Sequence, residues 1–142
     1  MKTKTIIGWR EWLSLPELEL DRIKAKIDTG ARTSALHAFE VDAYRDDDIA
    51  MVRFLMHPVQ NNQDIVRECR ARVIDERWVT DSGGHKERRF VIQTTAKLAQ
   101  IEWPIEITLT NRDTMKFRML LGRTAMKNIV VDPSSSYLIS RH

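Results

Sequence analysis

Short runs in which apolar and polar residues alternate constrain the fold of this chain more than any other feature. The clearest runs cover residues 103–110, 22–27 and 52–56, and weaker ones cover residues 65–75 and 88–95. Alternation with a period of two places one set of side chains in a core and the other in solvent, as in a half-buried β-strand. The sequence therefore predicts a domain built mainly from short strands.

Polar and glycine-rich clusters separate these runs, at residues 46–48, 60–63, 81–84 and 111–113. Such clusters are typical of turns between strands. Pro104 lies inside the clearest run and lacks a backbone N–H. We therefore expect its strand to lie at a sheet edge or next to a bulge.

Helical character is limited to two short stretches, Leu15–Leu20 and Arg123–Lys127, the second directly after Gly122. The 142 residues suffice for one hydrophobic core and are too few for two. We therefore predict a single mostly-β domain over residues 1–142, a barrel or folded sandwich with one short C-terminal helix.

The charge balance argues against a nucleic-acid-binding protein. Its 23 basic and 20 acidic residues leave a net charge of only +3, which favours acidic partners weakly. The four tryptophans, Trp9, Trp12, Trp78 and Trp103, do not interleave with a basic stripe along the sequence. We expect most of them to pack in the core or in an interface rather than against bases.

Cys69 is the only cysteine, so no disulfide can form within the chain. We interpret it as a small buried residue rather than a nucleophile, because no base is assigned to it. No apolar run is long enough for a signal-peptide core or a membrane span. A cytoplasmic protein that does not contact membranes is the expectation.

The segment Lys26–Ala31, with the sequence Lys-Ile-Asp-Thr-Gly-Ala, is the first candidate for a site. A strand would deliver Asp28 to a sharp turn, where Gly30 permits tight backbone geometry and Thr29 can hydrogen-bond within the turn. Taken alone, the segment fits an ordinary turn at the end of a strand equally well.

Two further segments gain meaning from their order along the chain. Met119–Arg123, with the sequence Met-Leu-Leu-Gly-Arg, suits a strand packed behind an active-site loop. Residues 78–85 followed by 88–92 form a predicted hairpin with a glycine-rich tip, which could close over a cleft and exclude water. Each segment also has a simpler interpretation. The first can be a buried strand that precedes a helix, and the second can be an ordinary surface hairpin.

The order of these three segments resembles the retropepsins, the single-domain aspartic peptidases of retroviral type, and most closely the bacterial RimB-type family, often labelled "ATP-dependent zinc protease". The hairpin departs slightly from that pattern, with Asp81 and Gly83 where more serines are expected. The matching segments are Gly8–Trp12, Leu15–Leu18, Ile23–Ala38, Ser82–His85, Leu109–Arg112, Met119–Met126 and Val131–Ser134.

The resemblance implies a retropepsin-like acid-protease barrel and an aspartic endopeptidase. Such enzymes need two carboxylates around one water, and this chain has one Asp-Thr-Gly, so a homodimer would supply the pair. By resemblance, the catalytic segment is Asp28, Thr29 and Gly30; the substrate-binding residues are Ala31, Arg32, Ser82, Gly83, Gly84 and His85; and the supporting residues are Leu121, Gly122 and Arg123.

The family label raises zinc and ATP, and the sequence favours neither. The four histidines, His37, His57, His85 and His142, form no His-Glu-x-x-His, and there is no phosphate-binding Gly-x-x-x-x-Gly-Lys-Ser/Thr loop. We therefore expect no metal and no cofactor. A zinc-dependent peptidase stays open as an alternative.

The expected substrate is a peptide or protein, and the modest basic excess with Arg32 suits an acidic, glutamate-rich one. Arg112 and Arg123 could also bind carboxylates, although an ion pair within the fold explains Arg123 better than Arg32. The resemblance further suggests a functional link to an ATP-grasp glutamate ligase. A dimeric module that binds peptides without cleaving them is the second alternative.

Overall fold

The computed structural model describes residues 4–59, 64–80, 83–111 and 117–140. Strands dominate these residues, and two single turns of 3-10 helix interrupt them, η1 (Pro16–Leu18) and η2 (Arg123–Ala125). The strands are β1 (Thr5–Gly8), β2 (Arg10–Leu15), β3 (Leu20–Ile27), β4 (Ser34–His37), β5 (Phe39–Asp46), β6 (Ile49–Met56), β7 (Arg67–Thr80), β8 (Lys86–Leu98), β9 (Ile101–Thr110), β10 (Met119–Leu121) and β11 (Ile129–Asp132).

Six of the strands close into a barrel, in the order β2-β3-β10-β4-β9-β8. The contact that closes the ring is the pairing of Ser14 in β2 with Lys97 in β8. Strands β7, β6 and β5 continue the sheet outward from β8. The mostly-β, retropepsin-like barrel expected from the sequence is confirmed.

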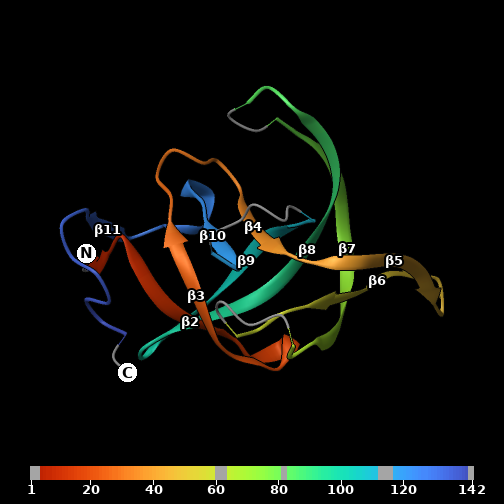
Figure 1. Ribbon diagram of the computed structural model, residues 1–142, viewed down its shortest axis with the longest axis horizontal. Helices are drawn as coiled ribbons and strands as arrows, with labels where there is room; N and C mark the ends of the chain where they lie inside the picture. Colours follow the sequence, from red (N-terminus) through yellow and green to blue (C-terminus); the bar gives the residue numbers. More distant parts are fainter. Residues whose placement is uncertain (1–3, 60–63, 81–82, 112–116, 141–142) are drawn as a thin grey trace.

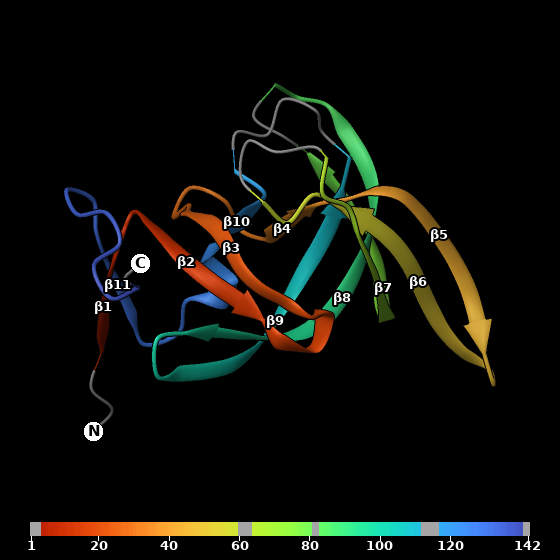
Figure 2. The same ribbon diagram turned by 60° about the horizontal axis from the view of Figure 1, so that its bottom comes forward.

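Two hairpins extend beyond the barrel. The β7–β8 hairpin is long, with strands of 14 and 13 residues, and its outer part arches above the barrel (Figure 1). The β5–β6 hairpin projects away from the barrel in both views (Figures 1 and 2). Its turn is formed by Asp47 and Asp48, both with positive φ, where the acidic cluster predicted a turn.

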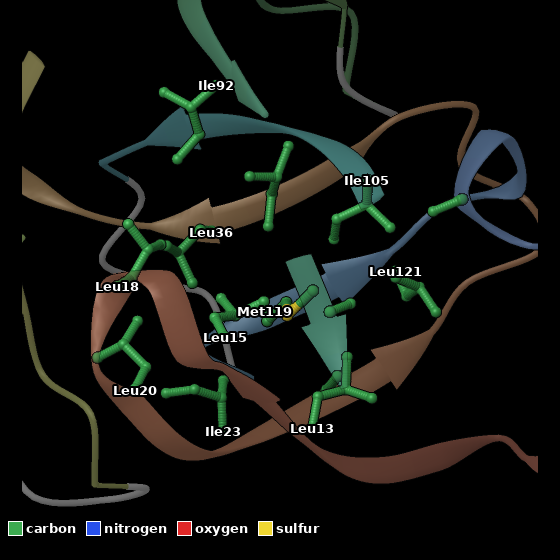
Figure 3. Packing of buried hydrophobic residues seen from close by; sticks show 14 of the residues in the cluster. Leu13, Leu15, Leu18, Leu20, Ile23, Leu36, Ile92, Ile105, Met119 and Leu121 are labelled. Carbon is green, nitrogen blue, oxygen red and sulfur yellow. The ribbon is translucent and has the colours of Figure 1, made fainter. Parts of the chain in front are cut away.

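The barrel is filled by the apolar residues of the alternating runs. Residues from η1 and from the barrel strands point into one common space (Figure 3), and the labelled ones are Leu13, Leu15, Leu18, Leu20, Ile23, Leu36, Ile92, Ile105, Met119 and Leu121. Because β3 buries Ile23, Ala25 and Ile27 and turns the residues between them outward, its solvent face is basic.

The predicted strands all appear, but the predicted helices are too long. Leu15 ends β2 and Leu20 begins β3, so only the three residues of η1 turn between them. The C-terminal helix predicted over 123–127 is likewise reduced to η2. Proline at the start of η1 and tight hydrogen bonds from η2 to the neighbouring loop favour a single turn in both places.

Pro104 lies in a part of β9 where the missing backbone N–H breaks no pairing between strands. It pairs with Thr95 of β8, while β4, the neighbour of β9 on the other side, pairs only with Ile107–Thr110. Within the part of the chain that the structure describes, Pro104 therefore occupies the half of β9 that has a single neighbouring strand, as an edge position requires.

Of the tryptophans, Trp78 departs most from the expectation of a core position. Trp103 is half-buried, and its indole N–H donates to the carbonyl of Ala125 at 2.9 Å. Trp78, in contrast, is 68% exposed on β7. As for membranes, the described residues include no helix with the length and apolarity that a bilayer crossing requires.

Candidate active site

The position of Asp28 is fixed by β3, the strand that it directly follows. β3 ends at Ile27, and β10 pairs with it in parallel, placing Leu121 beside Ile27. The N–H of Asp28 donates to the carbonyl of Leu121 at 2.9 Å, and the N–H of Ile27 donates to the carbonyl of Trp9 at 2.8 Å. The strand end that delivers the carboxylate is therefore tied on both sides.

The turn after β3 uses the Asp28 carboxylate itself. Its Oδ1 accepts the N–H of Gly30 at 3.0 Å, and its backbone carbonyl accepts the N–H of Ala31 at 3.2 Å. A Cβ at position 30 would lie 3.3 Å from the same Oδ1, a tight contact with the carboxylate. This is an aspartate-capped turn that leaves the Asp28 side chain half-buried.

The Leu-Leu-Gly-Arg segment packs directly behind this turn. A Cβ on Gly122 would lie 2.5 Å from the carbonyl carbon of Thr33, so only glycine lets the two backbones approach. The N–H of Gly122 donates to Ser34 Oγ at 3.0 Å, and the N–H of Arg123 donates to the carbonyl of Ala31 at 2.8 Å.

The Arg123 side chain closes the turn from outside. Its Nη1 donates to the carbonyls of Thr29 at 3.2 Å and Gly30 at 3.3 Å. The N–H and the hydroxyl of Thr124 both donate to the carbonyl of Arg32, at 3.1 and 2.9 Å. Residues 29–32 are thus held almost entirely through their backbone, which leaves the Thr29 and Arg32 side chains exposed.

A cleft of about 1200 Å³ lies between this turn and the β7–β8 hairpin. Its floor includes Asp28, Gly30 and Ala31, and its wall includes Thr108 of β9. The outer part of β7, residues 77–80, forms the opposite side. We call residues 75–80 and 86–91 the flap arms, because they form the outer part of the hairpin, which arches above the barrel (Figure 1).

The flap arms are held to the cleft wall by charged groups. Arg77 Nη1 lies 3.1 Å from Glu106 Oε2 of β9, and Arg77 Nε lies 2.7 Å from Asp75 Oδ2. The hydrogen bond from Arg77 lowers the pKa of Asp75 below its ordinary range. These side chains are all substantially exposed, so the attachment is weak compared with the backbone bonds of the turn.

Arg89, on the other flap arm, is an unusual case because its side chain is only 7% exposed. Its Nε donates to Glu87 Oε2 at 2.9 Å and its Nη1 to Thr108 Oγ1 at 3.4 Å. Thr110 Oγ1 donates to the same oxygen of Glu87 at 3.0 Å. A buried guanidinium thus forms part of the cleft lining, with its carboxylate partner Glu87 outside that lining.

Arginines therefore dominate the charge of the cleft. Arg77 and Arg89 have carboxylate partners, whereas Arg32 and Arg123 pair with no carboxylate among the described residues. Among the described residues, the acids that line the cleft are Asp28 and Glu106. Arg32 and Arg123 thus add two positive charges without carboxylate partners to the cleft that holds Asp28.

The structure gathers most of the residues predicted for the site. Those that line the cleft are Asp28, Gly30, Ala31, Arg32 and Arg123. Leu121 and Gly122 are buried behind the turn, as a supporting role requires. Gly83, Gly84 and His85 are exposed at the end of the hairpin and do not line the cleft as it stands. Ser82 lies outside the described residues.

Sequence reasoning missed several polar residues of the cleft, among them Arg77, Arg89, Glu106 and Thr108. Glu106 and Thr108 alternate along the clearest strand, but alternation does not reveal that one end of β9 faces a cleft. Arg89 follows Arg88 directly, and the strand period alone predicts that the two side chains lie on opposite faces.

The residues weighed for other chemistry lie apart from the turn. His37 is buried in β4, and His85 is exposed beside the hairpin tip. Among the described residues, no three His, Cys, Asp or Glu side chains gather as metal ligands. Burial raises the pKa of the Cys69 thiol to about 11, so the thiol stays protonated at neutral pH, consistent with a core residue.

Comparison with known proteins places this geometry in a family. A family model described as "RimB-like: Retropepsin-like aspartic endopeptidase RimB" matches residues 6–142. The chain belongs to the RimB-like family. The crystal structure of a Legionella pneumophila protein of unknown function has the same fold, with a TM-score of 0.80 and 25% identity over 96% of this chain and 98% of that one.

Curated relatives of this RimB-like chain are longer proteins with a different name. A "Probable alpha-L-glutamate ligase" of Shewanella pealeana is 44% identical over 137 residues, which are 96% of this chain and 30% of the relative. A protein of the same name from Desulfotalea psychrophila is 46% identical over 132 residues, which are 92% and 28%. The RimB-like chain thus spans less than a third of these relatives.

Proposed function

We propose that this chain is one subunit of a homodimeric aspartic endopeptidase in which the two Asp28 carboxylates act on one water. The observation that carries the proposal is the Asp28 turn itself. The Asp28 carboxylate is half-buried on the floor of a large cleft and accepts the Gly30 N–H, while the backbone of its turn is hydrogen-bonded to β10 and η2. Rigid placement of the reacting group on a scaffold is what catalysis requires.

The chemistry follows from the two carboxylates. Close like charges cannot both ionise cheaply, so the pair holds one proton and titrates as a unit. The ionised carboxylate takes a proton from the water, whose oxygen attacks the peptide carbon, while the protonated carboxyl hydrogen-bonds the carbonyl oxygen. The C–N bond then breaks, and the leaving nitrogen takes up a proton.

A second copy is needed because one chain supplies one such carboxylate. An exposed apolar pair on the β1–β11 sheet supports this dimer. In the β1–β11 sheet, Ile6 lies opposite Val130, and these side chains are 53% and 41% exposed. Ile6 is three residues before Trp9, whose carbonyl accepts the Ile27 N–H.

The dimer contact can be tested by substituting this apolar pair. Ile6→Asp places a charge in the proposed interface, so we expect sedimentation velocity to show monomers and peptide cleavage to fall with them. Ile49→Asp is the matched control, because Ile49 is 44% exposed on the projecting β5–β6 hairpin. A wild-type protein that stays monomeric at all concentrations and still cleaves would contradict the shared site.

The cleft charges support an acidic substrate. Arg32 and Arg123 are free of carboxylate partners within the described ranges and line the same cleft as Asp28, so substrate carboxylates can pair with them. The names of the longer relatives give this a chemical context, since a similar segment there belongs to probable glutamate ligases. We propose that the chain hydrolyses glutamate-rich peptides, including bonds of the kind that such a ligase forms.

Digestion of a peptide library, with products identified by mass spectrometry, tests the activity and the specificity together. We expect cleavage enriched beside acidic residues and insensitive to a metal chelator. Loss of activity on chelation, with recovery on adding zinc, would favour a zinc peptidase. Tight binding of acidic peptides without any cleavage would favour a binding module.

A further inference from the structure

A row of cations on the outer face of the barrel leads to the catalytic turn. Arg22, Lys24 and Lys26 alternate with the buried residues of β3, and Arg10 of β2 lies opposite Lys26. We call these four residues the basic track. Lys26 is two residues before Asp28, so the track ends at the floor of the cleft. None of the four lines that cleft.

Aromatic side chains fix three of these cations in place. The Trp12 ring stacks on Tyr137, with centroids 5.9 Å apart, and the Arg22 guanidinium lies over it at 4.5 Å. The Arg10 guanidinium lies 4.6 Å from the Trp9 ring and 5.0 Å from the Tyr137 ring. The Lys24 ammonium lies 5.4 Å from the Phe117 ring. Cation–π contacts of this kind orient a charge without neutralising it.

The track is short of compensating charge. Arg10, Lys24 and Lys26 form no ion pair with a carboxylate in the part of the chain that the structure describes. At the end far from Asp28 lies a shallow cavity of about 260 Å³, lined by Trp12, Arg22 and Lys97 together with the one acid Asp21. The surface therefore carries positive charge from this cavity to the cleft.

We propose that the basic track is an exosite that binds the acidic part of a substrate outside the cleft. Successive cations on β3 are two residues apart, about 7 Å along the strand. An extended peptide with acidic residues presents carboxylates at the same spacing on one side. The track thus matches a chain of acidic residues that continues beyond the scissile bond. This inference rests on the proposed peptidase function, whose substrate it extends.

An acidic peptide fits this surface better than a nucleic acid does. The tryptophans do not interleave with basic residues along the sequence, but strand pairing brings Trp9 and Trp12 among Arg10, Arg22 and Lys24. Single-stranded nucleic acids bind by stacking bases on aromatic faces. Here Tyr137 and Arg22 already pack against the Trp12 ring, which leaves less of it for a base. Charge, rather than ring stacking, is what this surface offers.

Binding by an inactive protein tests the exosite independently of catalysis. In the Asp28→Asn background, the Kd of a fluorescent peptide of twelve glutamates is compared with that of one of four, by anisotropy at fixed ionic strength. We expect the double substitution Lys24→Gln and Lys26→Gln to weaken binding of the long peptide about tenfold. This fold-change corresponds to the loss of two exposed charge contacts whose strength lies at the upper end of the usual range. The short peptide should lose less affinity.

The matched control removes two positive charges elsewhere, with Arg45→Gln and Arg72→Gln in the projecting part of the sheet. Both residues are exposed and lie on neighbouring parts of β5–β7, outside the cleft lining. This control should leave the ratio of the two affinities unchanged. Equal weakening by the control and the track variants would overturn the exosite, as would an oligonucleotide that binds the track more tightly than the long peptide at equal charge.

These outcomes are separable from failure of the peptidase. Track-dependent binding in a protein that cleaves no peptide would leave the exosite standing and remove the proposed catalysis. Cleavage of acidic peptides with a KM that does not depend on Lys24 and Lys26 would leave the proposed catalysis standing and remove the exosite.

Discussion

The Asp28 turn and the flap arms face each other across one cleft, but they are held by different forces. Residues 28–32 are fixed by buried or short backbone hydrogen bonds to β10 and η2. The arms are attached to β9 by side chains, through the solvent-exposed Arg77–Glu106 ion pair and the hydrogen bonds of Arg89 and Glu87 to Thr108 and Thr110. Backbone contacts give a fixed geometry, whereas exposed ion pairs break at low cost. The difference indicates a rigid floor that positions the chemistry beneath a cover that can move.

The largest expected effect comes from removing the charge on the floor. Asp28→Asn should lower kcat by about 10⁴-fold or more, because the pair can no longer take a proton from water. Its free energy of unfolding should change by less than about 0.5 kcal/mol, since the side chain is half-buried and Asn can still accept the Gly30 N–H. Cleavage assays and thermal melts measure the two quantities.

Asp46→Asn is the control for this substitution, because Asp46 is exposed at the end of β5. It should retain full activity. Peptide cleavage at a normal rate by pure Asp28→Asn protein would remove the assignment of the catalytic group.

Two glycines sharpen the comparison, because each is needed for a different reason. In Gly122→Ala the new Cβ would meet the Thr33 backbone, so the floor must shift, at a cost of about 3 kcal/mol in unfolding free energy. In Gly84→Ala nothing lies within 4 Å of the Cβ, and only the φ of +82° is unfavourable, at about 1 kcal/mol.

Denaturant unfolding and kinetics separate these two effects. Gly122→Ala should lower stability and kcat together, whereas Gly84→Ala should mainly raise KM. If Gly84→Ala were the more destabilising variant, the floor would not be the rigid side of the cleft.

The smallest expected effect concerns the attachment of the flap arms. Arg77→Gln should speed hydrogen exchange of the flap-arm amides about two- to threefold, without changing exchange in β10. Because Arg77 lowers the pKa of Asp75, the Asp75–Arg77 attraction is present above the ordinary pKa of an aspartate. It is lost as the pH falls through the depressed pKa of the folded protein.

Protonation of Asp75 removes the carboxylate that orients Arg77 on the same arm. Acid should therefore change exchange of the flap-arm amides in the wild type and not in Arg77→Gln, after correction for intrinsic exchange rates. Lys86→Gln, on the other arm, serves as the control for loss of one positive charge. Identical pH profiles in wild type and Arg77→Gln would mean that this ion pair does not hold the flap.

The same two regions differ in how far the sequence predicts them. The floor follows from local chemistry: alternation predicts β3, and the Asp-Thr-Gly turn and the glycine before Arg123 mark where backbones approach closely. The residues that pack around the floor can be named from the sequence because a short motif specifies them. The structure adds the reason for Gly122, which is the Thr33 backbone, a contact 89 residues away along the chain.

The cleft wall could not be predicted in this way. Glu106, Arg89 and Thr108 come together because β9 pairs with both β4 and β8, and such long-range register is not encoded in any local pattern. The helices were predicted too long because propensity favoured them, while short connections between paired strands left room for one turn only. The basic track likewise depends on pairing between β2 and β3.

Mixed dimers test the central claim, a site shared by two Asp28 carboxylates, most directly. Wild-type and Asp28→Asn chains are mixed in equal amounts, dissociated and reassembled at constant total concentration, and peptide cleavage is measured. If both carboxylates are needed, only dimers of two wild-type chains are active, and activity should fall to about a quarter of the all-wild-type value. Activity that falls only to about a half would show that each chain acts alone, and would contradict the shared site.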